Sequence, residues 1–365
     1  MEVMGQIKGT VNPSFWKGKK VYVTGHTGFK GSWLSLWLQS IGAIVKGYSL
    51  EPATDPALFL EANVADNMES EIGDIRNLEN LKKSMKSFNP DILIHMAAQP
   101  LVRLSYSNPI ETYTTNVIGT VNVLEAARYC ANLKAIVSVT TDKCYENKEW
   151  IWGYRENEPM GGHDPYSSSK GCAELVTSAY RQSFFHADET ASIASARAGN
   201  VIGGGDWADD RLIPDILKAF EKSEAVVVRN PMATRPWQHV LEPLSGYLVL
   251  AQQLFEHGDE FAEAWNFGPK DEDCKPVSWI LDKMVEKWGK GATWKLDKNN
   301  NPHEADYLKL DCSKAATRLH WQPNWNLEHT LNTIINWHQR WLSGKNTQEQ
   351  CLQEIAAYQN SKNEQ

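Results

Sequence analysis

The sequence predicts an α/β fold: a doubly wound parallel sheet with a second, smaller mixed α/β lobe. Two observations lead to this prediction. Short, nearly continuous apolar runs alternate with segments of helix length, as parallel strands buried on both faces do. A glycine-rich turn also follows the first apolar run and opens the first helical pattern. This order of elements is typical of sheets that bind ligands at the carboxyl ends of their strands.

Four parallel strands are expected in the first part of the chain, with helices between them. Each strand candidate is a short apolar run, and the segments between the runs are long enough to form helices. The strand candidates are residues 19–24, 43–48, 91–97 and 134–139, and the helix candidates include residues 29–41 and 111–130.

Three regions are expected along the chain. Residues 1–200 form a dinucleotide-binding domain, which parts of residues 236–268 rejoin. Past residue 201 the pattern loosens into glycines, prolines and shorter helices, so residues 201–345 are interpreted as a discontinuous substrate lobe. Residues 346–365 are rich in Asn, Gln and Glu and are predicted to be a peripheral polar tail with at most one short helix.

The composition narrows the class of protein. With 37 basic and 45 acidic residues the net charge is −8, and no basic stripe appears, which argues against a non-specific nucleic-acid binder. The six cysteines form no C-x-x-C pair, so no metal site is indicated and a reducing, cytoplasmic location is expected. No apolar run reaches the length of a membrane span, so no membrane association is expected.

The turn at residues 25–31 (Gly-His-Thr-Gly-Phe-Lys-Gly) is predicted to bind the pyrophosphate of a dinucleotide, as in a Rossmann-type domain. Small residues let backbone N–H groups approach the phosphates, and the positive end of the helix that follows favours an anion. The cofactor-binding residues predicted in this turn are Gly25, His26, Gly28, Phe29 and Gly31.

NAD is the predicted dinucleotide. An acidic residue at the end of the second strand normally holds the ribose 2′-hydroxyl of NAD, and Glu51 stands slightly late for that role. No arginine stands nearby in the sequence to hold the 2′-phosphate of NADP. Asp74, followed by Ile75, is placed where an aspartate could recognise the adenine. The alternative is that Asp74 caps the helix that starts near Leu78.

Tyr166 and Lys170 are the candidate catalytic pair. They are one helical turn apart, so they share a face of a helix, and a nearby ammonium group stabilises a phenolate. The tyrosine can then take a proton from a sugar hydroxyl although its unperturbed pKa is about 10. Tyr358 and Lys362 have the same spacing, but they stand in the polar tail without a cofactor motif and are not expected to be catalytic.

Together these motifs resemble the extended short-chain dehydrogenase/reductase superfamily, and the likeness covers most of the chain. It is carried by the glycine turn, the run 95–99 (His-Met-Ala-Ala-Gln), Asn116 and the Tyr166/Lys170 pair. The resemblance implies that the cofactor is also contacted by Ala97, Ala98, Gln99, Asn116, Tyr166 and Lys170.

Four stretches narrow the likeness to the CDP-glucose 4,6-dehydratases. They are residues 24–31, 197–207, 235–240 and the run 141–143, which reads Thr-Asp-Lys where nucleotide-sugar 4,6-dehydratases usually carry Thr-Asp-Glu. The resemblance implies a lyase that uses NAD to convert CDP-glucose into CDP-4-dehydro-6-deoxyglucose and water. Its steps are a transient oxidation at C4, an elimination across C5 and C6, and return of the hydride to C6. The product is an entry point to deoxysugars of bacterial surface polysaccharides such as lipopolysaccharide O-antigen.

The resemblance also assigns roles beside the sugar. Thr141 hydrogen-bonds the sugar O4, and Asp142 is the acid that assists departure of the C6 hydroxyl, for which burial must raise its pKa. Lys143 replaces the usual glutamate, although an ordinary lysine is only about 0.04% neutral at pH 7. Lys143 is either the C5 base after desolvation or a charged stabiliser of the enolate, in which case Glu146 or a water takes the proton.

Arginines are the expected ligands of the substrate diphosphate, because the guanidinium fork suits anionic oxygens. The alternative for each arginine is a solvated or ion-paired side chain. His239 and the pair His303/Glu304 stand in family-like stretches, and a structural role is at least as expected for these histidines. The predicted substrate-binding residues are Arg197, Asn200, Arg211, Arg235 and His239.

Two other functions stay open. A sugar-nucleotide 4-epimerase shares the fold and the Tyr166/Lys170 pair, but such enzymes usually have small residues in place of Asp142 and Lys143. A non-catalytic dinucleotide-binding protein could dispense with all these groups. The choice of cytosine rests on the resemblance alone. The resemblance further implies a homo-oligomer, a dimer or tetramer, that packs through helices such as residues 111–130 and 166–185.

Overall fold

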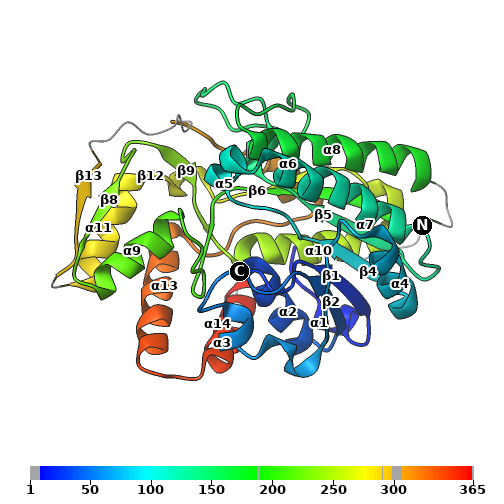
Figure 1. The fold of residues 1–365 in the computed structure, drawn as a ribbon, viewed down its shortest axis with the longest axis horizontal. Coiled ribbons are helices and arrows are strands. Elements are labelled where there is room, and N and C mark those ends of the chain that lie inside the picture. The colour runs from blue at the N-terminus through cyan, green and yellow to red at the C-terminus, as the bar shows by residue number, and fades with distance from the viewer. Residues whose placement is uncertain (1–8, 187–189, 290, 298–305, 364–365) are drawn as a thin grey trace.

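The computed structural model describes residues 9–186, 190–289, 291–297 and 306–363. Within them, the centre is a seven-stranded sheet with the order β11-β6-β5-β4-β1-β2-β3, and all neighbouring strands are parallel (Figure 1). The order steps outward from β1 in both directions, which is the doubly wound arrangement, so the predicted fold class is confirmed. The strands are β1 (Lys20–Thr24), β2 (Ile44–Ser49), β3 (Glu69–Ile72), β4 (Ile92–His95), β5 (Ala135–Val139), β6 (Ser192–Ala198) and β11 (Ala264–Phe267).

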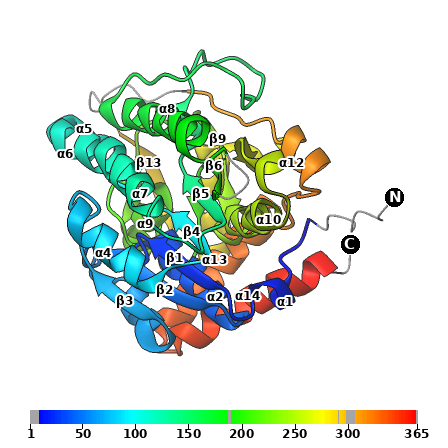
Figure 2. The same cartoon turned by 90° about the vertical axis from the view of Figure 1, so that its right-hand side faces the viewer.

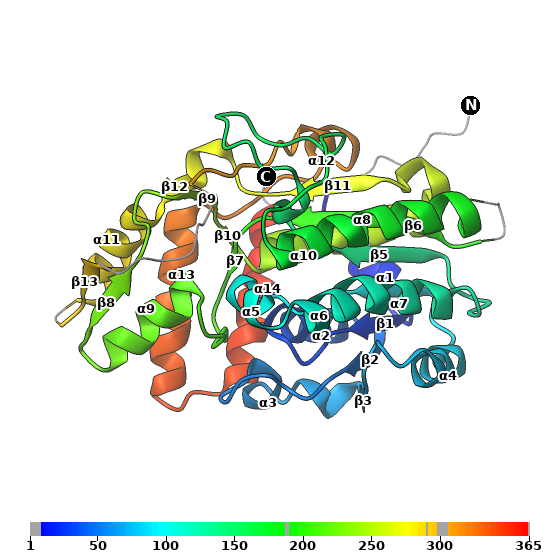
Figure 3. The same cartoon turned by 45° about the horizontal axis from the view of Figure 1, so that its top comes forward.

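Helices cover both faces of the sheet. On one face lie α4 (Leu78–Phe88), α7 (Gly119–Ala127) and α8 (Pro165–Phe184), and on the other lie α2 (Phe29–Ser40) and α10 (Leu241–His257) (Figures 2 and 3). Because both faces are removed from water, the central strands are apolar throughout instead of alternating with polar residues. None of the described helices combines the length and the apolar character that crossing a bilayer requires.

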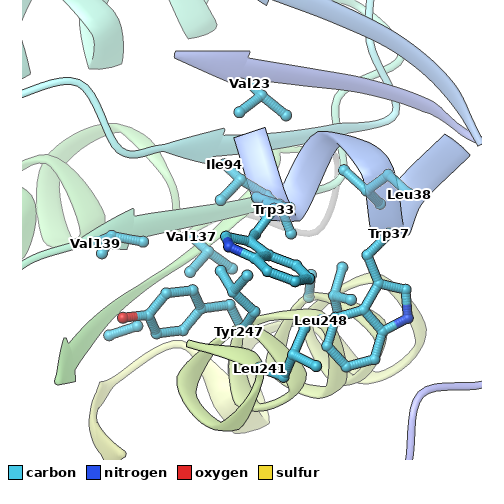
Figure 4. Packing of buried hydrophobic residues seen from close by; sticks show 14 of the residues in the cluster. Val23, Trp33, Trp37, Leu38, Ile94, Val137, Val139, Leu241, Tyr247 and Leu248 are labelled. Atoms are coloured by element: carbon cyan, nitrogen blue, oxygen red, sulfur yellow. The ribbon is translucent and has the colours of Figure 1, made fainter. Parts of the chain in front are cut away.

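Tryptophan rings fill much of the core between the sheet and α10. Figure 4 shows Trp33 and Trp37 of α2 between the strands and α10, with Ile94 and Val137 on the sheet side and Leu248 on the helix side. Both rings are fully buried. A ring of this size removes about 150–250 Å² from water, so each contributes several kcal/mol at about 25 cal/mol per Å². This packing fixes α2, and with it the glycine turn at its start.

The second lobe has its own sheet and its own core. β8 (Ala225–Val228) pairs in parallel with β13 (Thr293–Leu296), and helices surround the pair at the left end of Figure 1. An antiparallel pair, β9 (Thr234–Pro236) with β12 (Cys274–Pro276), makes the lobe mixed, as predicted. The helices are α9 (Leu212–Glu221), α11 (Val277–Trp288) and α13 (Leu327–Leu342).

The chain returns from the second lobe to the sheet. β7 (Val201–Ile202) leaves the sheet domain and pairs with β10 (Gln238–His239). α10 follows and covers β5 and β6, and β11 then adds a strand beside β6. Parts of residues 236–268 therefore lie against the sheet. The sequence did not predict β3 or β6, because β3 is short and polar and β6 consists largely of serine and alanine.

The C-terminal segment corrects a prediction. Instead of a peripheral tail, residues after 346 form the long helix α14 (Thr347–Asn363), which packs on α2. Cys351, Ile355 and Tyr358 are buried in the main core. Their spacing of four and three residues puts them on one face of a helix, while the polar residues that dominate the composition face solvent. The Tyr358 hydroxyl donates a hydrogen bond to Glu242 Oε2 at 2.6 Å.

We therefore expect Tyr358→Ala to lower the free energy of unfolding by about 3–5 kcal/mol, because it empties a space in the core. Urea unfolding followed by tryptophan fluorescence measures this loss. Asn360→Ala is the matched control: it removes an exposed side chain from the same helix and should change stability by less than about 0.5 kcal/mol. Equal stability of the two variants would show that α14 is not part of the cooperative core.

Candidate active site

A cavity of about 1570 Å³ opens where the carboxyl ends of the strands meet the second lobe. The segments that follow β1, β4, β5 and β6 all contribute to its wall, because parallel strands bring these ends to one edge of the sheet. α9 and β8 of the second lobe line the opposite side. Typical pockets for one ligand measure about 300–1,000 Å³, so this cavity has room for two large ligands.

The glycine turn forms the end of the cavity next to β1. Gly25 has a φ of +80°, and a Cβ there would lie 2.8 Å from the backbone nitrogen of Ala97. A Cβ at Gly31 would lie 2.0 Å from the carbonyl oxygen of Gly25. Gly28 is the N-cap of α2, and no side chain caps this helix. The cramped turn and the uncapped helix start fit the pyrophosphate of a dinucleotide, since backbone amides can meet the phosphates directly.

Beyond the turn, the cavity wall continues along the segments that follow β2, β3 and β4. Glu51, Asp74, Ile75, Ala97 and Ala98 all line it, as does Phe29 beside the turn. Asp74 forms an ion pair with Arg76 at 2.6 Å, and the hydrogen bonds from Arg76 lower the pKa of Asp74. The cap of α4 is Asn77, whose side chain accepts a hydrogen bond from the Asn80 amide. The alternative that Asp74 caps this helix is therefore wrong.

His26 does not face the cavity, although the sequence placed it among the cofactor ligands. Its side chain is fully buried and turns the other way, where Nε2 lies 2.7 Å from the Ser70 hydroxyl. Burial lowers its pKa to about 4, so the ring is neutral. The ring fills the space beside Gly47, where a Cβ would lie 2.2 Å from it. The prediction for this side chain is corrected to a packing role between the turn and β2.

Asn116 and Gln99 lie behind the cavity wall. Asn116 Oδ1 accepts a hydrogen bond from the Gln99 amide at 2.8 Å, and its Nδ2 donates to the Ser169 hydroxyl at 2.9 Å. Asn116 stands in a π-helical segment (Thr114–Ile118), a feature that often re-aims side chains at functional sites. Neither residue lines the cavity, and the hydrogen bond from Asn116 to Ser169 links this segment to α8, so their direct contact with a cofactor stays a prediction.

Tyr166 and Lys170 lie together at the start of α8 and line the cavity. The Asp164 side chain caps the helix by accepting from the Ser167 amide at 2.9 Å, so the pair stands on its first turns. Burial raises the pKa of Tyr166 to about 12, and a hydrogen bond with Thr141 opposes this rise. Burial lowers the pKa of Lys170 to about 8, and the charge of Glu174 opposes this fall. The two side chains therefore lie where burial disfavours the charged form of each.

Thr141, Asp142 and Lys143 follow β5 and face the same space. The Thr141 hydroxyl donates a hydrogen bond to Asp142 Oδ1 at 3.0 Å. Asp142 Oδ2 is buried and has no hydrogen-bond partner within the described protein. Burial raises the pKa of Asp142, although Lys143 and Arg235 lower it. A protonated carboxyl with a free oxygen in the cavity can donate a proton to a ligand there.

Lys30 is a cavity residue that the sequence analysis missed. Its ammonium lies 5.7 Å from the centre of the Tyr247 ring. Burial, Lys170 and Arg211 lower its pKa to about 7, while Asp142 raises it. A signal was available, because a lysine in the first turn of a helix opposes the helix dipole and needs another reason to stand there.

The second lobe contributes cations to the wall. Three of the residues predicted to bind the substrate line this side of the cavity, namely Asn200, Arg211 and Arg235. Arg211 forms an ion pair with Asp206 at 2.8 Å, and the Arg235 guanidinium donates to the Thr234 carbonyl at 3.0 Å. Arg211 lies close enough to Tyr166 to lower the pKa of its phenol, and Arg235 acts in the same way on Asp142.

Arg197 belongs to the structure rather than to the cavity wall. It lies inside β6, where its side chain points at α8 and pairs with Glu174 at 2.7 Å. Glu174 also accepts hydrogen bonds from Thr140 and Ser195. Both members of the pair are buried, and the nearby Arg197 charge holds the pKa of Glu174 below its usual value despite burial. The prediction that Arg197 clamps a diphosphate is corrected to an ion pair.

His239 and Glu146 are corrected in the same way. His239 is fully buried between the rings of Trp33 and Trp325, and burial lowers its pKa to about 3. Glu146 pairs with Lys148 at 3.7 Å on the outside of its loop and does not line the cavity, so it is no longer a candidate base. His303 and Glu304 lie outside the described residues, as does the side chain of Lys362.

The chain matches known proteins over most of its length. The family described as GDP-mannose 4,6 dehydratase matches residues 22–334. A CDP-glucose 4,6-dehydratase from Salmonella typhimurium is 60% identical over 352 residues, which are 95% of this chain and 98% of that protein. Among solved structures, a dTDP-glucose 4,6-dehydratase from Bacillus anthracis, in complex with NAD, has a TM-score of 0.74 at 22% identity, covering 90% of this chain and 99% of that one. A UDP-glucose 4-epimerase from Thermotoga maritima has a TM-score of 0.75 at 20% identity, covering 88% and 99%. The two structures share the fold.

The Arg197–Glu174 pair generates a prediction. Arg197→Met should lower the free energy of unfolding by about 3–5 kcal/mol, because it leaves a carboxylate buried without its cation. Arg155→Met removes a largely exposed arginine that pairs with Asp311 and should cost less than about 1 kcal/mol. Urea unfolding of both variants makes the comparison.

A second substitution separates charge from packing in this test. Adding Glu174→Gln to Arg197→Met removes the stranded charge and should recover part of the lost stability. If Arg197→Met and Arg155→Met were equally stable, the structural role of Arg197 would be refuted.

Proposed function

The chain belongs to the GDP-mannose 4,6-dehydratase family, and we propose that it is an NAD-dependent lyase that converts CDP-glucose into CDP-4-dehydro-6-deoxyglucose and water. The observation that carries this proposal is Asp142: a buried carboxyl with a raised pKa and an unpartnered oxygen, placed beside the Tyr166/Lys170 pair. A proton donor next to a proton acceptor is what a dehydration needs and an epimerisation does not. The relative that is 60% identical is a CDP-glucose 4,6-dehydratase, which supports the substrate.

NAD fits the end of the cavity built from the glycine turn, Asp74 and Ala97. Gly25, Gly28 and Gly31 would hold its pyrophosphate, and Tyr166 and Lys170 would face its reactive end. The chemistry that NAD supplies when bound is temporary storage of a hydride, taken from C4 of the glucose ring and given back to C6.

The oxidation begins with Tyr166. Its phenolate takes the proton of the C4 hydroxyl, and the Lys170 ammonium one turn away stabilises that phenolate. Because burial raises the pKa of Tyr166 to about 12, the phenol needs this cation to act near neutral pH. Thr141 hydrogen-bonds Tyr166 and supports the O4 atom.

The elimination uses the residues after β5. Oxidation of C4 to a ketone acidifies the C5 proton, which then leaves while the C6 hydroxyl departs as water. Asp142 gives that hydroxyl a proton, and burial keeps the proton on Asp142 until then. Lys143 lines the cavity next to Asp142 and either takes the C5 proton or stabilises the enolate. With Glu146 facing away, a water is the alternative acceptor.

The diphosphate lies between the sugar and the nucleoside, and Arg211, Arg235 and Asn200 line the cavity where it would pass. The guanidinium groups suit its oxygens, since each can donate two parallel hydrogen bonds. Arg211 already shares its charge with Asp206, which holds the side chain in place.

We also propose that the protein is a homo-oligomer. Ile110 of α6 (Pro109–Tyr113), Ile118 of the π-helical segment and Leu175 of α8 are exposed by 79%, 50% and 61%, and both other elements contact α8. Exposed apolar side chains on neighbouring elements support burial against another subunit. The predicted dimer or tetramer through these helices fits that exposure. The cytoplasmic location and the role in surface polysaccharides stay predictions.

The experiment that tests the function follows one deuterium. The protein is incubated with NAD and with CDP-, dTDP-, UDP- or GDP-glucose labelled at C4, and product masses and label positions are recorded. We expect CDP-glucose to lose one water and the deuterium to appear on the C6 methyl group. Unchanged product mass with an inverted C4 would identify an epimerase, and no conversion of any sugar nucleotide would identify a binding protein.

Lys143→Ala tests the second half-reaction. The variant should bind NAD as the wild type does but should exchange the C5 proton with solvent at least about 100-fold more slowly, because a general base or charge stabiliser contributes about 10²–10⁴-fold. Isotope exchange measured by NMR gives this rate. Lys86→Ala, which removes an exposed lysine of α4 outside the cavity, is the control and should exchange normally. Undiminished dehydration by Lys143→Ala would refute the assignment.

A further inference from the structure

The far end of the cavity lies in the second lobe, and this inference about it rests on the proposed function. The reacting carbons of the sugar must meet Tyr166, and the diphosphate follows along Arg211 and Arg235. The nucleoside is the last part of this linear molecule, so its base lies beyond the arginines. There the wall is built from the first turn of α9 and from β8 (Figures 1 and 3).

At this end of the cavity, apolar side chains form a surface that can cover one face of a planar base. Pro214 of α9, Val226 and Val228 of β8, and Val277 of α11 all line it. Apolar side chains bind any base by covering its faces, so they do not distinguish one pyrimidine from another. Selection needs a polar group at the edge of the ring, since the pyrimidines differ there in hydrogen-bond donors and acceptors.

Asp215 is the polar group that this end provides. Of the four aspartates at residues 206–215, the other three are neutralised by nearby cations: Asp206 by Arg211 at 2.8 Å, Asp209 by Lys218 at 2.7 Å, and Asp210 by Arg103 at 2.6 Å. In the described part of the chain, Asp215 forms no ion pair, and it lines the cavity with an exposed side chain. Desolvation raises its pKa to about 6 while the charges of Lys218 and Arg229 lower it, so the carboxyl is mostly ionised at pH 7.

A carboxylate in the cavity wall that forms no ion pair within the described protein can accept a hydrogen bond from a ligand that brings a donor. Cytosine presents a 4-amino group, a hydrogen-bond donor, where uracil and thymine present a carbonyl oxygen, an acceptor. The carboxylate accepts from the first and repels the second. We propose that Asp215 accepts a hydrogen bond from the 4-amino group of cytosine and thereby selects CDP-linked sugars over UDP- and dTDP-linked ones.

Two variants test this. Asp215→Asn removes the charge, and its amide can turn either its oxygen to an amino group or its NH₂ to a carbonyl. We expect wild-type protein with NAD to bind CDP more tightly than UDP by calorimetry, and Asp215→Asn to shrink this ratio by about tenfold or more. The ratio of kcat/KM for CDP-glucose and UDP-glucose should shrink in parallel. Asp209→Asn is the matched control, because it removes an equal charge from an exposed position outside the cavity and should keep the wild-type ratio.

Three outcomes would overturn the proposal. They are a wild-type protein with no preference for CDP, an unchanged ratio in Asp215→Asn, and equal weakening of CDP and UDP, which would place Asp215 on the ribose or phosphates instead. The proposed function fails separately. If the wild type preferred CDP through Asp215 but dehydrated no sugar nucleotide, the reaction would be wrong and the recognition of the base would stand.

Discussion

The buried carboxylate of Glu174 is the group on which the chemistry of the cavity depends. Arg197 and two hydroxyl groups of the sheet side hold it ionised at the centre of the protein. One turn earlier on α8, Lys170 has to carry a positive charge in a place where burial favours the neutral amine, and the field of Glu174 opposes that loss. The positive charge on Lys170 that Tyr166 needs is therefore stabilised by a carboxylate that residues of the sheet hold in place. β6 takes part in catalysis in this indirect way without any of its side chains lining the cavity near the sugar.

Desolvation then assigns the protonation states of the groups that meet the substrate. The same loss of water raises the pKa of Asp142 and lowers that of Lys170, because it disfavours whichever form is charged. Burial thus favours the protonated form of Asp142, while the charge of Glu174 limits the loss of the proton from Lys170. Asp142, after β5, and Lys170, near the start of α8, line the same cavity.

The sequence predicted the sheet, the glycine turn and the Tyr166/Lys170 pair, because each rests on local rules: apolar runs, small residues at a turn, and the period of a helix. The predictions were wrong where the role of a residue depends on the direction of its side chain. Arg197 and His239 stand in family-like stretches, but inside a strand and at a helix start their side chains turn into the core. The helix α14 was missed because its composition is polar on average, although Cys351 and Tyr358 carry a seven-residue spacing that was visible. Lys30 was missed because it stands within the glycine turn, whose other residues were already explained by pyrophosphate binding.

Cationic side chains line the cavity although the chain is acidic overall. The protein carries a net charge of −8, and Lys30, Lys143, Lys170, Arg211 and Arg235 stand in the cavity wall together with acidic residues such as Asp142 and Asp206. Each species expected there is an anion: a diphosphate, a phenolate, and an enolate formed when C5 loses its proton. In a dry site, fixed positive charge stabilises such species far more than it would in water, and it need not reorganise during the reaction. Burial raises the pKa of Asp142 in spite of Lys143 and Arg235, because desolvation outweighs their attraction for a carboxylate. The cavity can therefore place cations beside a carboxyl group whose burial favours the protonated form that the loss of water requires.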